Sequence, residues 1–183
     1  MPNEYTLYGA PMSLYTGKAR AYLIFKKLPY NEVFSSLKVY KSIIVPNTGV
    51  RFVPVLKTPK DEYLQDTAMI IDTLEQRHPE RSITPESAKQ KLVSYLFETW
   101  ADEWLVIPAM HYRWNKANFP FIYEEFGKVI VPNMPRFIRA FLGKKIGAKF
   151  KGFVPLLGIT DKSIPAIESW YENHVLPLLD KHF

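Results

Sequence analysis

With 183 residues, 47% of them hydrophobic, and a formal net charge of +6, the chain is long enough to bury a core in one domain or two small ones. It contains no cysteine, which excludes a disulfide framework, a thiolate zinc site and a cysteine nucleophile. No run approaches the ~20 apolar residues of a membrane span and no signal-peptide pattern opens the chain, so we expect a cytoplasmic protein.

The first part of the chain alternates short strands with helices. Residues 5–8 (YTLY) are rich in strand-forming residues and end at a Gly-Ala-Pro turn. Residues 16–27 have the apolar spacing of a helix, and a Leu-Pro pair ends it. Residues 31–34 (NEVF) predict a second strand, parallel to the first because a helix separates them. The basic residues of the helix that we expect at its solvent face are Lys18, Lys26 and Lys27.

A hairpin is predicted next. Residues 36–48 do not decide between helix and irregular chain. Residues 52–56 (FVPVL) and 62–65 (EYLQ) predict two short strands across a five-residue turn. Two strands joined by so short a turn form an antiparallel hairpin.

The end of the first domain is marked by a helix and a linker. Asp66 and Thr67 have the side chains of a helix start, because they can accept hydrogen bonds from the first turn. Residues 1–78 therefore read as an α/β domain with the order β-α-β and then β-β-α. Residues 79–86 are polar and punctuated by proline, which predicts the domain boundary. Residues 87–183 have helical periodicity throughout and predict an all-helical domain.

An apolar stripe predicts one long helix in the second domain, with Pro108 kinking it. The stripe recurs every three or four positions, which favours a core face over a ligand pocket. Two more helical regions are expected over 121–149 and 163–182. The residues of the stripe are Leu92, Leu96, Trp100, Trp104, Ile107, His111 and Trp114.

The positive charge is concentrated in residues 136–151, which hold six basic residues and no acid. Such a cluster indicates an anionic ligand or surface, not a general nucleic-acid-binding protein; a solvated helix face is the alternative. Phe137, Phe141, Ile146 and Phe150 lie among the charges, which also fits docking on an acidic protein or an anionic membrane. The basic residues are Arg136, Arg139, Lys144, Lys145, Lys149 and Lys151.

Two features of the first domain indicate a binding site. Pro54 near the start of a strand forfeits a ladder hydrogen bond, so it needs a sheet edge or a special turn. A cis peptide bond there would leave the backbone N–H and C=O of Val53 available to an extended, peptide-like ligand. Asp66 and Thr67 open the following helix, where backbone N–H groups point at whatever binds there.

These residues resemble the N-terminal domain of the glutathione S-transferase family, and the helical remainder resembles that family's C-terminal domain. The resemblance covers essentially the whole chain. It implies a thioredoxin-like α/β domain followed by an all-α helical domain. It rests on residues 5–8 (YTLY), 13–20 (SLYTGKAR), 28–30 (LPY), 53–56 (VPVL) and 64–70 (LQDTAMI).

The resemblance implies that the chain binds glutathione as a co-substrate. In the family, the residue matching Val53 pairs with the cysteinyl backbone of glutathione beside a cis proline, here Pro54. The acid–hydroxyl pair matching Asp66 and Thr67 holds the γ-glutamyl end. The family commonly grips the glycyl carboxylate with a lysine, but Phe52 stands at that position. The candidates in its place are Lys38, Lys41 and Arg51.

The family's catalytic hydroxyl or thiol lies in the loop after the first strand, five residues before a basic residue of the first helix. Counting back from Lys18 gives Ser13, which resembles the serine-type classes. Tyr15 and Tyr8 are the alternatives, since tyrosine-type members place their hydroxyl nearer the strand end. Ser13 is expected to donate a hydrogen bond that stabilises the thiolate of glutathione.

The resemblance therefore implies a detoxifying glutathione transferase that activates the thiol for attack on a soft, hydrophobic electrophile. A homodimer is expected, with the electrophile near Trp104, His111 and Tyr112. No histidine has metal-ligand spacing and no nucleotide-binding motif appears, so we expect neither a metal nor a nucleic-acid partner. The alternative is a non-catalytic binding or scaffold protein, favoured by the missing lysine and by a second domain that looks short at its end.

Overall fold

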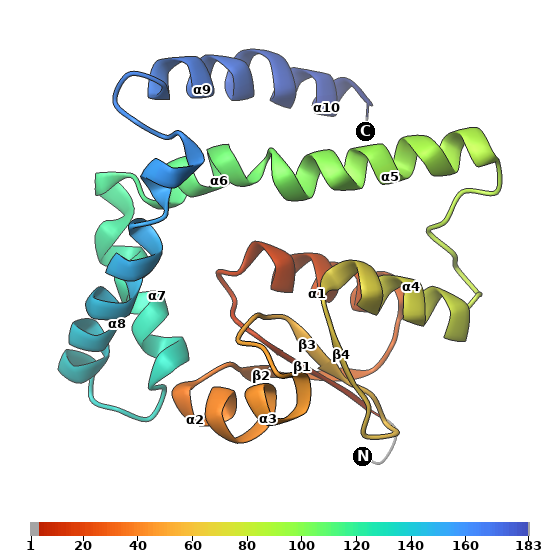
Figure 1. The fold of residues 1–183 in the computed structure, drawn as a ribbon, viewed down its shortest axis with the longest axis horizontal. Helices are drawn as coiled ribbons and strands as arrows, with labels where there is room; N and C mark the ends of the chain where they lie inside the picture. Colours follow the sequence, from red (N-terminus) through yellow and green to blue (C-terminus); the bar gives the residue numbers. More distant parts are fainter. Residues whose placement is uncertain (1–3, 183) are drawn as a thin grey trace. The chain divides into compact units, whose positions relative to one another are not determined.

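The computed structural model describes residues 4–182 and shows an α/β part followed by helices (Figure 1), which confirms the predicted fold class. The chain divides into two compact units. The first consists of the residues up to Pro85 and of Gly127–Arg139. The second consists of Glu86–Phe126 and the residues from Ala140 on. The boundary at 79–86 stays a prediction, because the first unit also takes a later segment. In the first part the elements are β1 (Tyr5–Gly9), α1 (Leu14–Lys26), β2 (Tyr30–Phe34), α2 (Leu37–Val39), α3 (Val45–Thr48), β3 (Val55–Lys57), β4 (Tyr63–Gln65) and α4 (Thr67–Arg77).

The four strands form one mixed sheet in the order β2-β1-β3-β4. The strand β1 runs parallel to β2 and antiparallel to β3, and β3 pairs antiparallel with β4. The parallel pair and the hairpin are as predicted. The third strand begins at Val55, not at residue 52, because Pro54 has no N–H to donate to a neighbouring strand.

Helices cover both faces of the sheet (Figure 1). Leu7 and Leu56 face a core cluster shared with α1 and α4, and both are fully buried. Their neighbours Tyr8 and Val55 point to the opposite face and pack on Ile44. The segment 36–48 is helical there, with a π-helical turn, Tyr40–Ile44, between α2 and α3. The residues that α1 and α4 add to the first cluster are Ala19, Tyr22, Leu23, Ile70 and Leu74.

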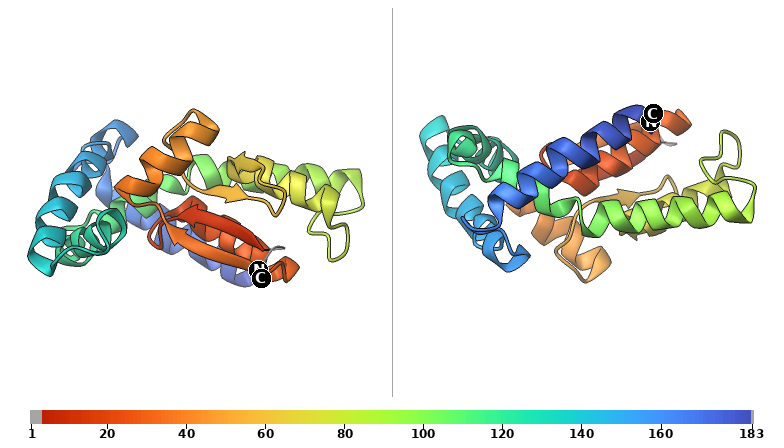
Figure 2. Two further views of the ribbon diagram at one scale, coloured as in Figure 1. Left: turned by 90° about the horizontal axis from the view of Figure 1, so that it is seen from below. Right: turned by 90° about the horizontal axis from the view of Figure 1, so that it is seen from above.

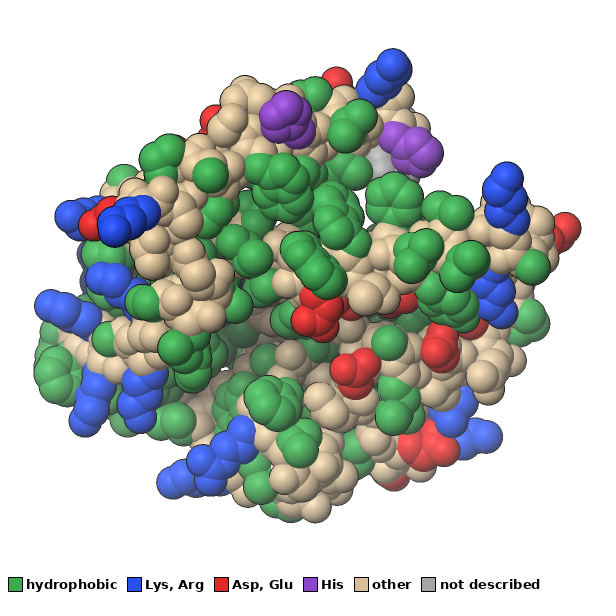
Figure 3. Space-filling model, turned by 45° about the horizontal axis from the view of Figure 1, so that its top comes forward, with side chains coloured by type: hydrophobic (Ala, Val, Ile, Leu, Met, Phe, Trp, Pro, Cys, Tyr) green, Lys and Arg blue, Asp and Glu red, His purple; other side chains and the backbone are tan. Residues whose placement is uncertain are grey.

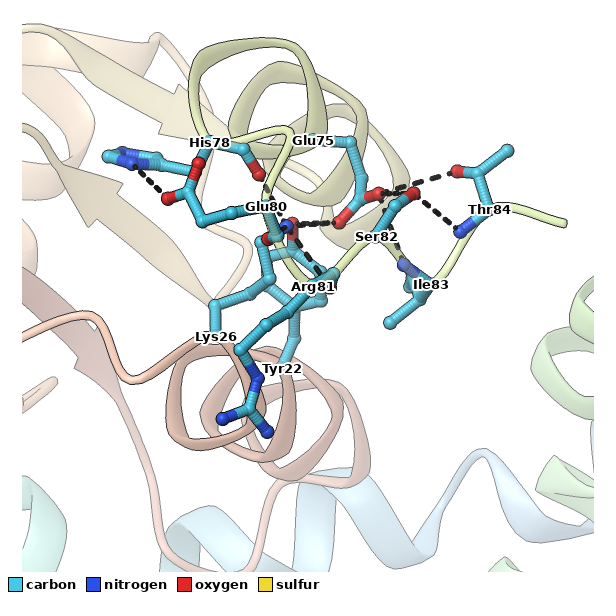
Figure 4. A network of polar contacts seen from close by, with 9 residues as sticks. All are labelled: Tyr22, Lys26, Glu75, His78, Glu80, Arg81, Ser82, Ile83 and Thr84. Atoms are coloured by element: carbon cyan, nitrogen blue, oxygen red, sulfur yellow. Dashed lines mark hydrogen bonds and ion pairs between the residues drawn. The ribbon is translucent and has the colours of Figure 1, made fainter. Parts of the chain in front are cut away.

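Lys26 joins α1 to the chain that leaves α4 (Figure 4). The sequence predicted this lysine at solvent, but its side chain is only 1% exposed. Its ammonium group lies 2.9 Å from the Glu75 carboxylate and donates to the carbonyls of His78, Glu80 and Arg81. The prediction was wrong because the segment after α4 turns back over α1 and supplies acceptors in place of water.

Glu75, on α4, binds the same segment that follows α4 (Figure 4). Its carboxylate accepts hydrogen bonds from the Tyr22 hydroxyl at 2.7 Å, the Ser82 hydroxyl at 2.5 Å and the Ile83 N–H at 3.2 Å. Together with Lys26 it fixes the chain that follows α4 against α1 and α4. We call the Lys26–Glu75 pair and these partners the α1–α4 clamp.

The remainder of the described chain is helical. The predicted long helix is broken at Trp104 and Leu105, one turn before Pro108, since Pro108 cannot donate a helical hydrogen bond to the Trp104 carbonyl. No helix within residues 4–182 is both long and apolar enough to cross a membrane. The elements are α5 (Ala88–Glu103), α6 (Val106–Arg113), a 3-10 turn Lys116–Asn118, α7 (Phe119–Ile130), α8 (Arg136–Lys151), a 3-10 turn Val154–Leu157, α9 (Ile164–Trp170), a π-helical turn Tyr171–Val175 and α10 (Leu176–His182).

The apolar stripe is buried only in its second half. Leu92 and Leu96 on α5 are 60% and 61% exposed, whereas His111 and Trp114 are buried. Helices α7 and α8 lie side by side in both views (Figure 2), and glycines allow them to approach closely. A Cβ atom on Gly147 would lie 2.8 Å from the Tyr123 ring.

Candidate functional site

Ser13 lies in the loop between β1 and α1, where it caps α1. Its Oγ accepts a hydrogen bond from the Thr16 N–H at 3.2 Å, which satisfies one N–H of the first helical turn. A hydroxyl has one proton to donate and two acceptor sites, so this bond does not use the O–H. The half-buried Ser13 hydroxyl is therefore chemically able to donate to a ligand at the start of α1.

The path of this loop depends on residues that the sequence reasoning missed. Thr16 is fully buried, and its Oγ1 accepts from the Ala10 N–H at 3.3 Å. A Cβ atom on Gly9 would lie 2.3 Å from the Thr16 methyl carbon, so glycine is required. Ser35 donates from its N–H at 2.9 Å and its hydroxyl at 3.0 Å to the Gly9 carbonyl. The sequence predicted Gly9 only as part of the turn after the first strand, not as the residue that fixes the path of the loop.

The two tyrosines named as alternatives lie in different surroundings. Tyr8 is buried on the sheet and stacks on Tyr63, with ring centroids 6.5 Å apart. Burial raises the pKa of the Tyr8 hydroxyl, and the neighbouring Tyr63 raises it further. Tyr15 lies half-buried in the first turn of α1, next to the loop that carries Ser13. Tyr15 is thus better placed than Tyr8 as an alternative to Ser13.

Val53 lies at the start of the hairpin, and the Val53–Pro54 peptide bond is cis. The strand β3 begins at Val55, which pairs with Tyr8 and Gln65, so Val53 lies beyond the last ladder pair. The Val53 side chain packs against the core cluster around Tyr8 and Val55. Its side chain therefore faces the protein, while its peptide group takes no part in the ladder of β3.

Asp66 and Thr67 form the N-terminus of α4. The exposed Asp66 carboxylate accepts from the Ala68 N–H at 2.9 Å and the Met69 N–H at 3.5 Å, and Thr67 is buried. The Asp66 backbone has φ 81°, in the left-handed region that favours glycine. Such a conformation costs about 1–3 kcal/mol and is typically concentrated at ligand sites.

The sheet register brings these features to one end of the sheet. Tyr8 pairs with Val55, so the chain enters the Ser13 loop at the end where β3 begins. Val55 also pairs with Gln65, so β4 reaches Asp66 at the same end. The peptide group of Val53, the N-terminus of α4 and the loop before α1 therefore converge. We call this region the sheet-end site.

The basic candidates for a carboxylate partner have exposed side chains. Lys38 lies on α2, and Lys41 lies on the π-helical turn that packs over the same face as the Val53 side chain. Arg51 lies two residues before Val53 along the chain. The structure thus places Lys41 and Arg51 on segments next to Val53, and their role stays a prediction.

The residues expected to line an electrophile pocket make contacts within the helical part. The His111 Nε2 atom lies 2.9 Å from the Glu168 carboxylate, and the Tyr112 hydroxyl donates to Glu172. Burial raises the pKa of Tyr112 and the hydrogen bond to Glu172 raises it further, to about 12. Trp104 is 54% exposed at the break between α5 and α6. His111 and Tyr112 therefore hold α6 against α9 and the turn that follows it, a role that the sequence did not indicate.

A comparison with protein families decides what the first domain is. Residues 7–82 match the profile described as "Glutathione S-transferase, N-terminal domain". These residues form a glutathione S-transferase N-terminal domain. The family resemblance drawn from the sequence motifs is thereby confirmed, and the glutathione S-transferase domain includes Ser13, Val53 and Asp66.

Solved glutathione S-transferases share the fold. The enzyme of Methylobacterium radiotolerans, in complex with glutathione sulfonate, is 20% identical over 79% of this chain and 63% of its own, with a TM-score of 0.52. The Tau class enzyme of mango, Mangifera indica, is 15% identical over 81% and 79%, with a TM-score of 0.52. That of Methylobacillus flagellatus, with glutathione bound, is 17% identical over 80% and 67%, with a TM-score of 0.50.

These likenesses establish the fold alone, because the identities are low. The chain spans less than two thirds of the length of the Methylobacterium radiotolerans protein. None of the curated protein sequences compared with the chain matches it.

Proposed function

We propose that the chain binds glutathione at the sheet-end site and activates its thiol for attack on a soft, hydrophobic electrophile. The observation that carries this proposal is the convergence of Val53, Asp66 and Ser13 at one end of the sheet in a glutathione S-transferase domain. Two proteins of the same fold were solved with glutathione or its sulfonate, which supports the choice of ligand.

Each part of glutathione has a chemically matched partner at this site. The peptide group of Val53 lies outside the ladder, so an extended tripeptide can pair with it as an added strand does. The Asp66 carboxylate matches the α-ammonium of the γ-glutamyl end, and the N-terminus of α4 at Thr67 matches its α-carboxylate. Lys41 or Arg51 would hold the glycyl carboxylate.

A hydrogen bond from Ser13 can supply most of the free energy needed to lower the thiol pKa. Lowering a thiol pKa from about 8.5 to about 6.5 requires about 2.7 kcal/mol. A hydrogen bond from a hydroxyl to a charged sulfur contributes about 1.5–3 kcal/mol, and a helix N-terminus about 0.3–1 kcal/mol. Ser13 then acts as a hydrogen-bond donor, and the thiolate sulfur forms the bond to the electrophilic carbon. A homodimer and an electrophile beside Trp104, His111 and Tyr112 belong to this proposal.

Calorimetric titration of glutathione tests the binding step. Asp66→Asn keeps an acceptor that caps α4 but removes the charge, so it should weaken binding about 10- to 100-fold. Asp61→Asn is the matched control, because Asp61 is also an exposed acid at positive φ, 62°, and lies in the turn of the hairpin that precedes Asp66. It should bind glutathione as the unaltered chain does. Equal affinities for all three proteins, or no binding at all, would contradict the proposal.

Substitution of Ser13 tests the chemical step. Ser13→Asp keeps the cap on α1 but has no proton to donate, and its negative charge repels a thiolate, so the thiol of bound glutathione should ionise less readily than in the unaltered chain. Conjugation to an aryl halide should fall about 10- to 100-fold while calorimetric binding remains. Ser87→Asp makes the same change at the equivalent cap of α5, where the Ser87 Oγ accepts from the Gln90 N–H at 3.2 Å, and controls for the effect of a new carboxylate on stability. Binding without conjugation by the unaltered chain would favour the non-catalytic alternative.

A further inference from the structure

The helix α8 carries a concentration of positive charge, most of it on exposed side chains. Its 16 residues include six basic side chains and no acid. Figure 3 shows Lys and Arg side chains gathered at the left edge, with hydrophobic side chains between them. On α8 itself, two apolar side chains are strongly exposed, since Phe137 is 73% and Phe141 is 68% accessible.

The buried side of α8 identifies which face is turned outward. Gly143 and Gly147 are buried, and Gly147 lies against Tyr123 of α7. Phe137 and Phe141 are four residues apart, so they lie one above the other on the side away from these glycines. The same helical spacing places Lys144 and Lys145 one turn further on, flanking the line of the two rings, and both are exposed.

This arrangement has the chemistry of an interfacial helix. Exposed phenylalanine rings are unfavourable in water and gain free energy when buried at the boundary between lipid headgroups and acyl chains. Lysines beside them can extend their alkyl stems along the apolar surface and place their charges at anionic headgroups. A nucleic acid duplex would use the charges but not a pair of exposed rings, so the two phenylalanines favour a lipid surface over a duplex.

Further apolar side chains are exposed in the segment that follows α8. Phe153 is 54% exposed and Leu156, in the following 3-10 turn, is 79% exposed. We propose that α8, through Phe137 and Phe141 with Lys144 and Lys145, docks the chain on an anionic phospholipid surface. This docking is independent of glutathione and uses none of the residues of the sheet-end site.

Co-sedimentation of the whole chain with vesicles tests the docking. Phosphatidylcholine vesicles containing about a third phosphatidylglycerol should bind the chain, and vesicles of phosphatidylcholine alone should bind it at least about tenfold less. Binding should weaken as salt rises to about 1 M, where charges are screened within about 3 Å. Equal binding to both kinds of vesicle, or none, would overturn the proposal.

Paired substitutions distinguish this face from the rest of the surface. Lys144→Gln with Lys145→Gln should weaken binding about 25-fold, since each lysine near the surface contributes about fivefold. Lys89→Gln with Lys91→Gln removes two exposed lysines of α5 and should leave binding unchanged. Equal losses in the two double variants would overturn the proposal.

A fluorescent label reports whether the rings enter the lipid. The chain has no cysteine, so Phe141→Cys would be its sole site for an environment-sensitive thiol label. Its emission should shift to the blue on anionic vesicles, whereas a label at Leu92→Cys on α5, also exposed, should not shift. If light scattering instead shows that the chain self-associates without vesicles, and Phe137→Ser with Phe141→Ser abolishes this, the face is a self-association surface and the proposal fails.

Discussion

Gly9 is the residue on which the loop before α1 depends most directly. Its carbonyl accepts two hydrogen bonds from Ser35, and the Thr16 side chain occupies the space that a Cβ atom would need. Since Ser13 lies in the loop that starts here, the position of the proposed catalytic hydroxyl follows from the absence of one methyl group.

A pair of glycine substitutions tests this account. Gly9→Ala should lower the free energy of unfolding by about 1–3 kcal/mol, because the added methyl would overlap Thr16. Gly17→Ala in α1 should raise it by about 0.5–1 kcal/mol, because the added Cβ would meet no side chain or other segment within 4 Å and alanine favours the helix. Urea unfolding measures both. Changes of the same sign would contradict the described packing.

At the scale of elements, the α1–α4 clamp makes stability depend on pH. Burial raises the pKa of Glu75, but hydrogen bonds from Ser82, Lys26 and Tyr22 and the charge of Lys26 outweigh it and lower the pKa to about 2. The ordinary value is 4.5, so the folded state favours the charged form. The resulting stability is present above about pH 4.5 and is lost as the pH falls towards 2.

Glu75→Gln should therefore lower the free energy of unfolding by about 3 kcal/mol at pH 7, because it also leaves Lys26 buried without its carboxylate. The difference from the unaltered chain should shrink between pH 4.5 and pH 2. Glu62→Gln is the control, since Glu62 pairs with Arg77 in water, and it should change stability little. Denaturant unfolding across this pH range measures both, and a pH-independent effect of Glu75→Gln would contradict the account.

The elements that the sequence predicted are those set by local pattern. The parallel strand pair and the hairpin follow from the spacing of short apolar runs, and the cap at Asp66 follows from its side chain. The burial of Lys26 depends on where the chain returns after α4, which no local pattern contains. The position of the helix break at Trp104 could not be predicted either, because Pro108 predicts that the helix is interrupted but not in which turn the interruption lies.

At the scale of the whole molecule, the α/β part and the helical part differ in how well the sequence periodicity predicts which side chains are buried. In the sheet, alternate residues face opposite cores, so Leu7 and Tyr8 could be assigned from periodicity two. In the helical part, periodicity predicts a face but not its partner, and Leu92 is exposed although it belongs to the apolar stripe. The residues of the sheet-end site could be proposed from their types and spacing. That they lie at the same end of the sheet follows only from the register of the strands.

The sheet-end site makes a spatial prediction that nuclear magnetic resonance can test. Glutathione added to the ¹⁵N-labelled chain should shift the backbone amide signals of Ser13, Val53 and Thr67, which lie at one end of the sheet. The amides of Tyr5 and Thr58 lie at the other end and should stay in place. Shifts confined to Tyr5 and Thr58, or no shifts at saturating glutathione, would contradict the central claim.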